Sequence, residues 1–521
     1  MLMWASKNER VVIDAGILFP QEECFDINYL IPDYSSLDAP RDLIITHGHE
    51  DHLGAVVHAV EHFPELRIWA PPFAAGILRK KFAYDKIKHR IFTYEENQIW
   101  DFEEWEIHPI HVNHSIPQTY GILLVDKARR FCALHISDFK CNLNNGFEAK
   151  IDLEKIEKLT KGIPQRFLFA DSTSILSKAE KTPDEASLIP TFEKIISDAQ
   201  GRVYFTLFSS NIERIQNILD ATLKDDRKLV PYGRSMNFYM EIAEELKILK
   251  DFQLAYKNPD SMDEETKNVV ILVSGCQGDF KSTFRRIAFA EEGTLKPQAG
   301  DTFVLSSKAI PGNEKKIAQV VSKLYEQGCK VITSDTAHVH VSGHAGREDV
   351  LILAHSFKPT HFVPIHGDSA FLYEHVTLMK EHFPKLKTEV LYNFHILSLM
   401  QDERVLITQQ EAPKPIMIHG RNIPIEAEAI SERRKVATTG LIFVSVKMDT
   451  IKNHKAKIEV DFMGLPQEFV HKDRLETFLQ VFVKENKIRD QEKYKEEMRV
   501  SVRRFFEAGL GYKPVVMIHL I

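Results

Sequence analysis

The amino-acid sequence predicts an α/β protein built from two or three domains, and three observations support this prediction. The chain has 521 residues, which is too many for one compact core. Short apolar runs alternate with amphipathic helical patterns, as in parallel sheets whose strands are connected by helices. A tail with a different pattern follows EAPKP (411–415), which has the composition of a linker. We therefore expect an α/β body followed by a smaller α+β domain.

Strands are predicted in the first 180 residues wherever an apolar run is bounded by polar or turn residues. These runs are VVIDAGILFP (11–20), DLIITHGH (42–49), RIWAPP (67–72), YGILLV (120–125), FCALHIS (131–137) and RFLFADST (166–173). A helix is expected over GAVVHAVEHF (54–63), because its apolar residues have helical spacing.

From about residue 183 the pattern becomes helical. Helices are predicted over 184–200, 210–224 and 233–250, and the strands between and after them over 202–210, 268–275, 301–307, 330–335 and 361–367. This alternation predicts a parallel sheet covered by helices. The tail contains a strand over 457–464, a mixed-charge helical run over 484–509 and a final strand over 514–521.

Composition and charge exclude several classes of protein. The hydrophobic fraction of 44% and the charged fraction of 27% are those of an ordinary globular chain. The formal net charge of −7 excludes a polycation, so any bound nucleic acid needs a local basic groove. No apolar run approaches the roughly 20 residues of a membrane span, and MLMWASKNER is too short and too charged for a signal peptide. We expect a cytoplasmic protein without a membrane partner.

The cysteines indicate a reducing compartment. There are five, an odd number without a CxxC pair: Cys24, Cys132, Cys141, Cys276 and Cys329. Such scattered cysteines argue against a disulfide framework, and we expect small buried side chains rather than metal ligands.

The segment THGHEDH, which follows an apolar strand, concentrates metal-binding chemistry. It offers His47, His49, Asp51 and His52 at positions i, i+2, i+4 and i+5. Neutral imidazole and carboxylate are the ligands that zinc prefers. One short loop cannot easily aim all four at one ion, but two neighbouring ions could share them. The spacing therefore predicts a metal site after this strand.

These residues resemble the HxHxDH motif of the metallo-β-lactamase superfamily, whose fold is an αββα sandwich. The rest of the superfamily pattern follows in order: Asp14 in VVID, His114 in VNHSIP and Asp138 in ISDFK. The resemblance implies that His47, His49, His114 and Asp138 hold one ion. It further implies that Asp51, His52, Asp138 and a later histidine hold a second ion, while Asp14 orients the motif loop.

Three further stretches resemble the motifs of the β-CASP branch, whose members cut nucleic acids. FADSTS supplies Asp171, HVHVSGHAGRED supplies His344, and FVPIHGD supplies His366, which would complete the second ion's ligands. A histidine at this last position goes with RNA substrates in the branch. The resemblance implies a metallo-β-lactamase domain at 1–180 and 331–411, an inserted β-CASP α/β domain at 181–330, and a linker and α+β domain at 412–521.

Within the β-CASP branch, the chain resembles the ribonuclease J family over nearly its whole length. The matching stretches include IDAGILFP, SSNIERIQ, GCQGD, GDTFVLSSKAIPGNE and the tail VRRFFEAGLGYKPVVMIHLI. The resemblance implies an enzyme with 5′-to-3′ exonuclease and endonuclease activity on single-stranded RNA, acting in rRNA processing, RNA maturation and mRNA decay. It implies two Zn²⁺ per subunit, with Mn²⁺ or Mg²⁺ as alternatives. It also implies a homodimer or homotetramer that joins an RNA helicase or a paralogous ribonuclease.

The resemblance also assigns catalytic and substrate-binding roles. His344 would protonate the leaving 3′ oxygen, and Asp51 would orient the attacking water. Ser307, His340, Ser342 and Gly343 resemble the pocket for a 5′-terminal monophosphate, and their hydroxyls, imidazole and backbone N–H are suitable donors to phosphate oxygens. Arg214, Arg234 and Lys281 could line an RNA channel or equally belong to a solvated face.

Two departures from the family pattern lead to expectations of their own. The chain begins about a dozen residues before VVID, so the glycine-rich opening strand is expected to be missing, through a late start or a real loss, leaving an exposed sheet edge. Ser137 replaces the usual glycine before Asp138, which would alter the loop but not the ligand. Two other functions stay open: a purely endonucleolytic RNA-processing enzyme, and a silent RNA-binding subunit of an active paralogue.

Overall fold

The computed structural model describes residues 1–521 except 21–26, 144–145, 178–179, 264, 294, 311, 401, 403, 448–456 and 487–489. The chain divides into two compact units. The first comprises Met1–Leu18 and Pro32–Lys414, and the second comprises Phe19–Ile31 and Pro415–Ile521.

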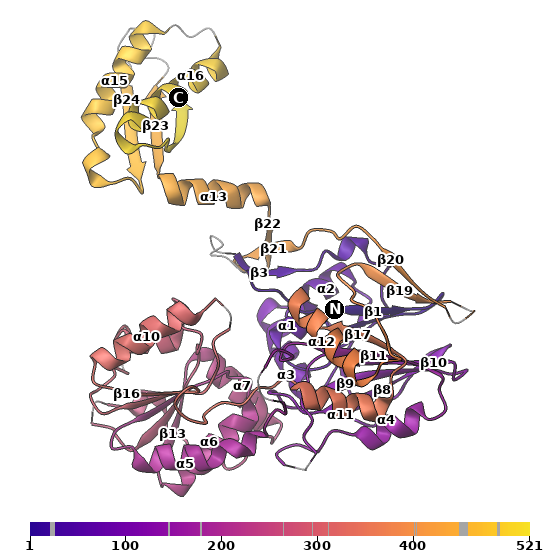
Figure 1. The fold of residues 1–521 in the computed structure, drawn as a ribbon. Helices are drawn as coiled ribbons and strands as arrows, with labels where there is room; N and C mark the ends of the chain where they lie inside the picture. Colours follow the sequence, from indigo (N-terminus) through magenta and orange to yellow (C-terminus); the bar gives the residue numbers. More distant parts are fainter. Residues whose placement is uncertain are drawn as a thin grey trace. The chain divides into compact units, whose positions relative to one another are not determined.

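Two β-sheets pack face to face in the first unit (Figure 1). The first sheet has the order β1-β2-β4-β5-β6, with β1 (Leu2–Ala5), β2 (Arg10–Ile13), β4 (Asp42–Ile44), β5 (Arg67–Ala70) and β6 (Ile91–Thr93). The second has the order β18-β17-β11-β10-β9-β8-β7, with β7 (Trp100–Asp101), β8 (Trp105–Val112), β9 (Thr119–Asp126), β10 (Phe131–Ile136), β11 (Gln165–Asp171), β17 (His361–Ile365) and β18 (Lys387–Thr388).

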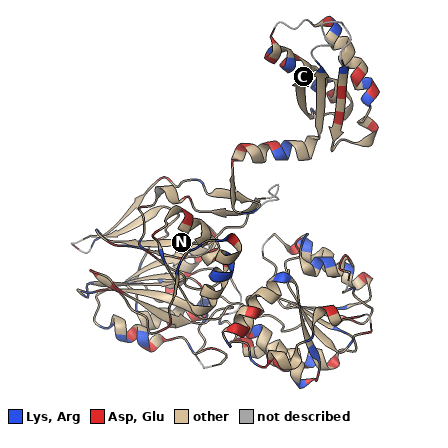
Figure 2. Cartoon of the chain, turned by 180° about the vertical axis from the view of Figure 1, so that it is seen from behind, with Lys and Arg blue, Asp and Glu red and all other residues tan. Residues whose placement is uncertain are grey.

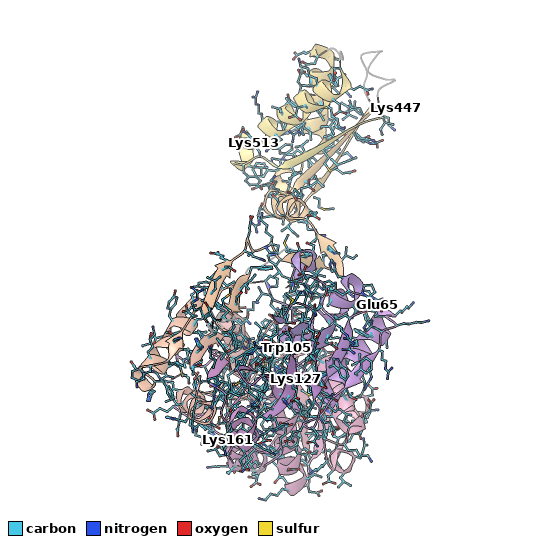
Figure 3. The ribbon with its side chains drawn as sticks, turned by 90° about the vertical axis from the view of Figure 1, so that its right-hand side faces the viewer. Glu65, Trp105, Lys127, Lys161, Lys447 and Lys513 are labelled. Atoms are coloured by element: carbon cyan, nitrogen blue, oxygen red, sulfur yellow. The ribbon has the colours of Figure 1, made fainter. Side chains whose placement is uncertain are left out.

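Side-chain alternation along the strands builds the core of this sandwich. Val11 and Ile13 of β2 join the apolar cluster between the sheets, whereas Val12 joins the cluster on the outer face. This is the two-residue period of a strand that is buried on both faces. Trp105 of β8 is also buried between the sheets, and Figure 3 shows it among the crowded side chains of this unit.

Helices cover the outer faces of both sheets. α2 (Val56–His62) and α3 (Pro72–Asp85) pack on the first sheet, where the short α1 (Glu50–Leu53) follows β4. α4 (Leu153–Thr160), α11 (Arg347–Phe357) and α12 (Ser369–His382) pack on the second. The hairpin of β19 (His395–Leu399) and β20 (Val405–Gln409) packs against the cluster between the sheets. The predicted αββα sandwich is therefore confirmed.

A third sheet of the first unit is wholly parallel, with the order β13-β14-β12-β15-β16. Its strands are β12 (Val203–Thr206), β13 (Lys228–Tyr232), β14 (Val269–Val273), β15 (Thr302–Leu305) and β16 (Lys330–Thr333). The helices around it are α5 (Ile189–Asp198), α6 (Ile212–Lys224), α7 (Arg234–Glu245), α8 (Phe252–Ala255), α9 (Thr283–Ala288) and α10 (Glu314–Glu326). The apolar strand–helix alternation after residue 183 predicted this inserted α/β layer, and it is confirmed.

The second unit is α+β. A small sheet joins β3 (Ile27–Ile31), β21 (Ile416–His419) and β22 (Ile423–Ile425), and α13 (Ala427–Thr439) follows. A second sheet of β23 (Leu441–Lys447), β24 (Lys457–Met463) and β25 (Val515–Leu520) packs on α15 (Lys472–Glu485) and α16 (Gln491–Leu510). Figure 2 shows Lys and Arg mixed with Asp and Glu along its helices. α16 buries Tyr494, Met498, Val502 and Phe506, so it is an amphipathic helix with a mixed-charge outer face.

Three details differ from the sequence-based expectations. A strand, β1, does precede β2 and pairs with it antiparallel, so the sheet edge lies one strand further out than expected. β3 was expected in the first domain, but it pairs with β21 of the second unit. The sequence did not predict this pairing because strands so far apart in the chain leave no local signal. The charged helix begins only at Gln491, where the Asp490 side chain accepts from the backbone N–H of Lys493 and caps it.

The cysteine and membrane expectations can be compared with the described residues. Cys132, Cys141, Cys276 and Cys329 are all free and buried, and Cys24 lies outside the described residues. Within the described part of the chain, no helix is both long enough and apolar enough to cross a bilayer.

Candidate metal centre

The candidate site lies where the strands of the sandwich end. β8, β10, β11 and β17 run in the same direction, since β8 and β10 are each antiparallel to β9 and the other pairs are parallel. Their carboxyl ends therefore meet at one edge, which is where ligands bind in such sheets. His114, Asp138, Asp171 and His366 come from these four ends, and the motif loop after β4 of the facing sheet supplies the rest.

Asp14 fixes the motif loop. Its buried carboxylate accepts hydrogen bonds from the backbone N–H of Thr46 at 2.7 Å and from the Thr46 hydroxyl at 2.9 Å. The Nδ1 of His52 lies 2.8 Å from the same carboxylate and must donate to it, because a carboxylate only accepts. The Nε2 of His52 is therefore the nitrogen left for a ligand, as the predicted orienting role of Asp14 requires.

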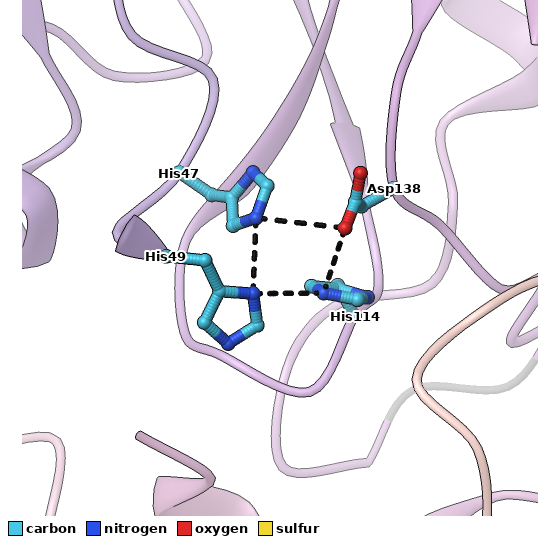
Figure 4. A group of neighbouring side chains, drawn as sticks. All are labelled: His47, His49, His114 and Asp138. Carbon is cyan, nitrogen blue, oxygen red and sulfur yellow. Dashed lines mark hydrogen bonds and ion pairs between the residues drawn. The ribbon is translucent and has the colours of Figure 1, made fainter. Parts of the chain in front are cut away.

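Four side chains form the first group (Figure 4). The Nδ1 of His49 lies 3.1 Å from the Nε2 of His47 and 3.1 Å from the Nε2 of His114. The Oδ2 of Asp138 lies 3.7 Å from His47 and 3.3 Å from His114. The Nδ1 of His114 donates to the Gly343 carbonyl at 2.7 Å, which leaves its Nε2 facing the group.

A second group lies beside the first and shares Asp138 with it. The Oδ1 of Asp138 lies 3.2 Å from the Nε2 of His52 and 3.0 Å from the Nδ1 of His366. The Oδ2 of Asp51 lies 3.6 Å from His52 and 3.5 Å from His366. All the candidate ligands of each group thus converge, with one carboxylate oxygen of Asp138 turned to each group.

The first group offers neutral imidazoles, whereas the carboxylates of the second group favour a positive charge there, which is a proton on its histidines when no cation is bound. Burial lowers the pKa of His47 and His114 well below the usual range and that of His49 to about 4, so these imidazoles are neutral and present lone pairs. Burial alone would lower the pKa of His52, but Asp138, Asp51 and Asp14 raise it to about 10. The Nε2 of His52 and the Oδ1 of Asp138 are buried without a hydrogen-bond partner among the described residues, although they face each other. Facing nitrogens, carboxylates and orphaned polar atoms are what a pair of zinc-like ions would satisfy.

His344 and Asp171 lie beside these groups, with His344 partly exposed and Asp171 buried. The Nδ1 of His344 lies 2.8 Å from the Oδ2 of Asp171, and the His344 side chain is 23% exposed. Burial opposes the charged imidazole, but Asp171 outweighs burial and raises the pKa of His344. Asp171 is held by the backbone N–H and hydroxyl of Thr173, at 2.9 and 2.7 Å. With Nδ1 paired to Asp171, His344 can therefore carry a second proton on Nε2.

The residues of the predicted phosphate pocket lie in two connected segments. Ser342 and Gly343 adjoin the metal groups: the Ser342 hydroxyl accepts from the backbone N–H of His344 at 3.1 Å, and Gly343 accepts from His114. A Cβ at Gly343 would lie 2.7 Å from the Ser115 side chain, so only glycine fits there. His340 and Ser306, the neighbour of Ser307, both accept hydrogen bonds from the Arg214 guanidinium.

The position of Arg214 differs most from what the sequence predicted. Arg234 and Lys281 are exposed, as either reading of them allowed, but Arg214 is 1% exposed and neither lines a channel nor faces solvent. Its partner Glu185 was not singled out at all. The one usable signal was weak: Arg214 lies within the helical pattern 210–224, beside Ile215 and four residues before Ile218, while its other neighbours are polar.

Comparisons with known families and proteins agree with this geometry. Residues 1–122 match the model of the metallo-β-lactamase superfamily, residues 200–324 that of the ribonuclease J β-CASP domain, and residues 331–391 that of the Zn-dependent metallo-hydrolase RNA specificity domain. Ribonuclease J of Sinorhizobium meliloti is 30% identical, covering 98% of this chain and 92% of its own. Ribonuclease J of Helicobacter pylori is 29% identical, over 88% of this chain and 67% of its own.

Among solved structures, a protein of unknown function from Enterococcus faecalis V583 superposes with a TM-score of 0.51. It is 13% identical and covers 78% of this chain and 96% of its own. At that identity the likeness shows a shared fold alone.

Proposed function

Since this chain belongs to the ribonuclease J family of metal-dependent RNA hydrolases, we propose that it degrades single-stranded RNA from a 5′-monophosphate end and also cuts internally. We further propose two Zn²⁺ ions per subunit, with Mn²⁺ or Mg²⁺ as substitutes. The observation that carries this proposal is the convergence of both ligand groups on Asp138, which presents one carboxylate oxygen to each.

The first ion would be held by His47, His49, His114 and Asp138, and the second by Asp51, His52, Asp138 and His366. Two bound divalent ions lower the pKa of water toward neutrality and stabilise negative charge on phosphate oxygens. In each group the candidate ligand atoms lie within 4.8 Å of one another, which supports an active enzyme over a silent subunit.

The chain's own groups supply the remaining steps. Asp51, whose side chain is 45% exposed, can accept a hydrogen bond from the attacking water and orient it. His344 holds a proton at Nε2 because Asp171 occupies Nδ1 and favours the charged ring, and we assign it the protonation of the leaving 3′ oxygen.

End recognition would come from Ser307, His340, Ser342 and Gly343. Hydroxyls, an imidazole N–H and a close backbone approach suit the oxygens of a terminal phosphate. Gly343 and His344 are adjacent in the chain, so a phosphate bound there would position the first linkage near the proposed acid. We propose that the enzyme acts in rRNA processing and mRNA decay in the cytoplasm, as a homodimer or homotetramer, together with an RNA helicase or a paralogous ribonuclease.

One experiment tests the activity and its polarity. RNA carrying a 5′-monophosphate or a 5′-triphosphate, labelled at either end, is incubated with the protein with and without a chelator. We expect labelled mononucleotides from the 5′-monophosphate substrate, slower release from the triphosphate, and no product with chelator. Metal analysis of the same sample should find two zinc ions per chain. Equal rates on the 5′-monophosphate and the 5′-triphosphate RNA would refute the end preference. Products that come only from internal cuts would refute the exonuclease activity.

A further inference from the structure

A fully buried ion pair lies behind the proposed phosphate pocket. Arg214 of α6 and Glu185, at the start of a 3₁₀ turn (Glu185–Leu188), are 1% and 0% exposed in their side chains. The guanidinium grips the carboxylate at two points, with Nε to Oε2 at 2.9 Å and Nη2 to Oε1 at 2.7 Å. A bidentate pair of this kind fixes orientation as well as charge.

The other donors of Arg214 reach the two pocket segments. Nη1 donates to the Ser306 carbonyl at 2.7 Å and to the Nδ1 of His340 at 2.9 Å, and Nη2 donates to the Val341 carbonyl at 2.9 Å. A guanidinium has five N–H donors, and each has a partner here. One side chain therefore connects the segment after β15 with the segment that carries His340 and Ser342.

This geometry fixes the proton position on His340. Arginine has only donors and stays charged, so the nitrogen it meets must be an acceptor. Nδ1 of His340 therefore carries a lone pair, and the ring's one proton is on Nε2. We propose that Arg214, held by Glu185, is a positioning residue of the 5′-phosphate pocket: it keeps His340 as a neutral Nε2–H donor and aligns the segments bearing Ser307 and Ser342. This inference rests on the proposed function of that pocket.

The charges around the ring agree with a neutral donor. Burial, then Arg214 and Lys308, lower the pKa of His340, while Glu185 and a hydrogen bond to the Ser306 backbone raise it, and the net pKa is about 3. The pocket would thus recognise phosphate by directed hydrogen bonds rather than by a titrating cation. The contribution of His340 to phosphate binding should therefore be constant through the physiological range of pH.

The first test reads the tautomer directly in the wild-type protein. Nitrogen-detected NMR of histidine-labelled protein, with the His340 signals assigned from their loss in His340→Gln, should show the proton on Nε2. The shifts should not titrate between about pH 5 and 8, where a free imidazole changes charge. A proton on Nδ1, or a titration midpoint near 6.5, would overturn the inference whatever the enzyme's activity.

The second test uses two replacements of His340. Glutamine places an amide N–H near the Nε2 position but offers Arg214 no good acceptor, whereas asparagine can accept from Arg214 but cannot reach the phosphate. We expect His340→Gln to keep more of the preference for 5′-monophosphate over 5′-hydroxyl RNA, and His340→Asn to keep more thermal stability. A purely structural histidine would give the same order in both measurements, and that result would contradict the proposal.

The third test compares two buried arginines. Arg214→Lys keeps a charge beside Glu185 but cannot serve five acceptors, so the monophosphate preference should fall about tenfold, the cost of a lost hydrogen bond to a charged group. The control is Arg202→Lys: Arg202, just before β12, is also 1% exposed and donates to the carbonyls of Thr266 and Asp263, away from the pocket. It should lose stability while its end preference stays.

The possible outcomes separate the two proposals. If the wild-type protein digests 5′-monophosphate and 5′-hydroxyl RNA equally, the pocket itself is refuted, and the role of Arg214 in it falls as well. If the wild-type preference is present but Arg214→Lys keeps it, or loses it no more than Arg202→Lys does, only the positioning role is refuted. Metal content, measured in every variant, should equal that of the wild type.

Discussion

The metal centre and the proposed phosphate pocket are held in place by different physics. In the metal centre the functional side chains contact one another directly, and a single carboxylate, Asp138, is common to both groups. In the pocket the functional groups are neutral, and one buried cation behind them, Arg214, connects their segments. The first site would therefore depend on its own proposed ligands, whereas the second would depend on a buried residue that is proposed to position the pocket without contacting the substrate. Substitutions should separate these two kinds of dependence.

The largest effect is expected from Asp138→Ala, because it removes a ligand from both groups at once. The chemistry of bound ions is worth several kcal/mol, so RNA cleavage should fall by roughly ten-thousandfold. Metal analysis of the purified variant should show the loss of both ions. The matched control is Asp126→Ala, which removes a buried carboxylate of β9 that pairs with Arg130 outside the site. It should lose stability and keep its metal, and equal metal loss in both variants would contradict the shared-ligand role.

A smaller but cleaner effect is expected from His344→Ala. The imidazole of His344 pairs with Asp171 at 2.8 Å. Its Nδ1 lies 3.9 Å from the Oδ2 of Asp138, which is beyond hydrogen-bonding distance of this proposed metal ligand. The kcat should fall by about a hundredfold to a thousandfold, as for loss of a general acid, while metal content stays near normal. His114→Ala is the contrasting variant, because His114 is a proposed ligand of the first ion and its loss should reduce bound metal. Metal loss in His344→Ala as large as in His114→Ala would make His344 a ligand instead.

Asp14→Asn is expected to have an intermediate effect that excess metal reverses. The amide keeps an acceptor for Thr46 but weakens the bond that aligns His52, and such changes typically cost about 10- to 100-fold in metal affinity. Cleavage measured against added zinc should shift to higher concentration with little change at saturation. The preference for 5′-monophosphate ends should be unaffected, because Asp14 contacts none of the pocket residues in the described chain.

The same contrast explains what the sequence could predict. Residues 47–52 and the apolar run before them predicted a strand, a loop and a metal site, because each of these is encoded within a few positions. The resemblance to a family supplied the distant partners His114, Asp138, Asp171 and His366, and the structure brings them together. Arg214 was not assigned, because its burial depends on Glu185 and on segments near residues 306 and 341 that no local pattern connects. The pairing of β3 with β21 was not predicted for the same reason.

The smallest effect on cleavage is expected from Glu185→Gln, whose main effect should be on the free energy of unfolding. Burial raises the pKa of Glu185, but Arg214 outweighs it and lowers that pKa to about 2 from an ordinary value of 4.5. A carboxyl group whose pKa is lowered on folding stabilises the folded state at pH values above its unfolded-state pKa. This stabilisation is lost as the pH falls toward the folded-state pKa. At neutral pH the variant should unfold more easily by about 3–5 kcal/mol, as when a buried pair loses one charge. Between pH 5 and 3 the gap to the wild type should narrow, as followed by urea denaturation at constant metal. If the difference in free energy of unfolding stays constant on acidification, Glu185 is not charged in the folded protein. The Glu185 carboxylate would then not hold Arg214, and the proposed cause of the His340 tautomer would be contradicted.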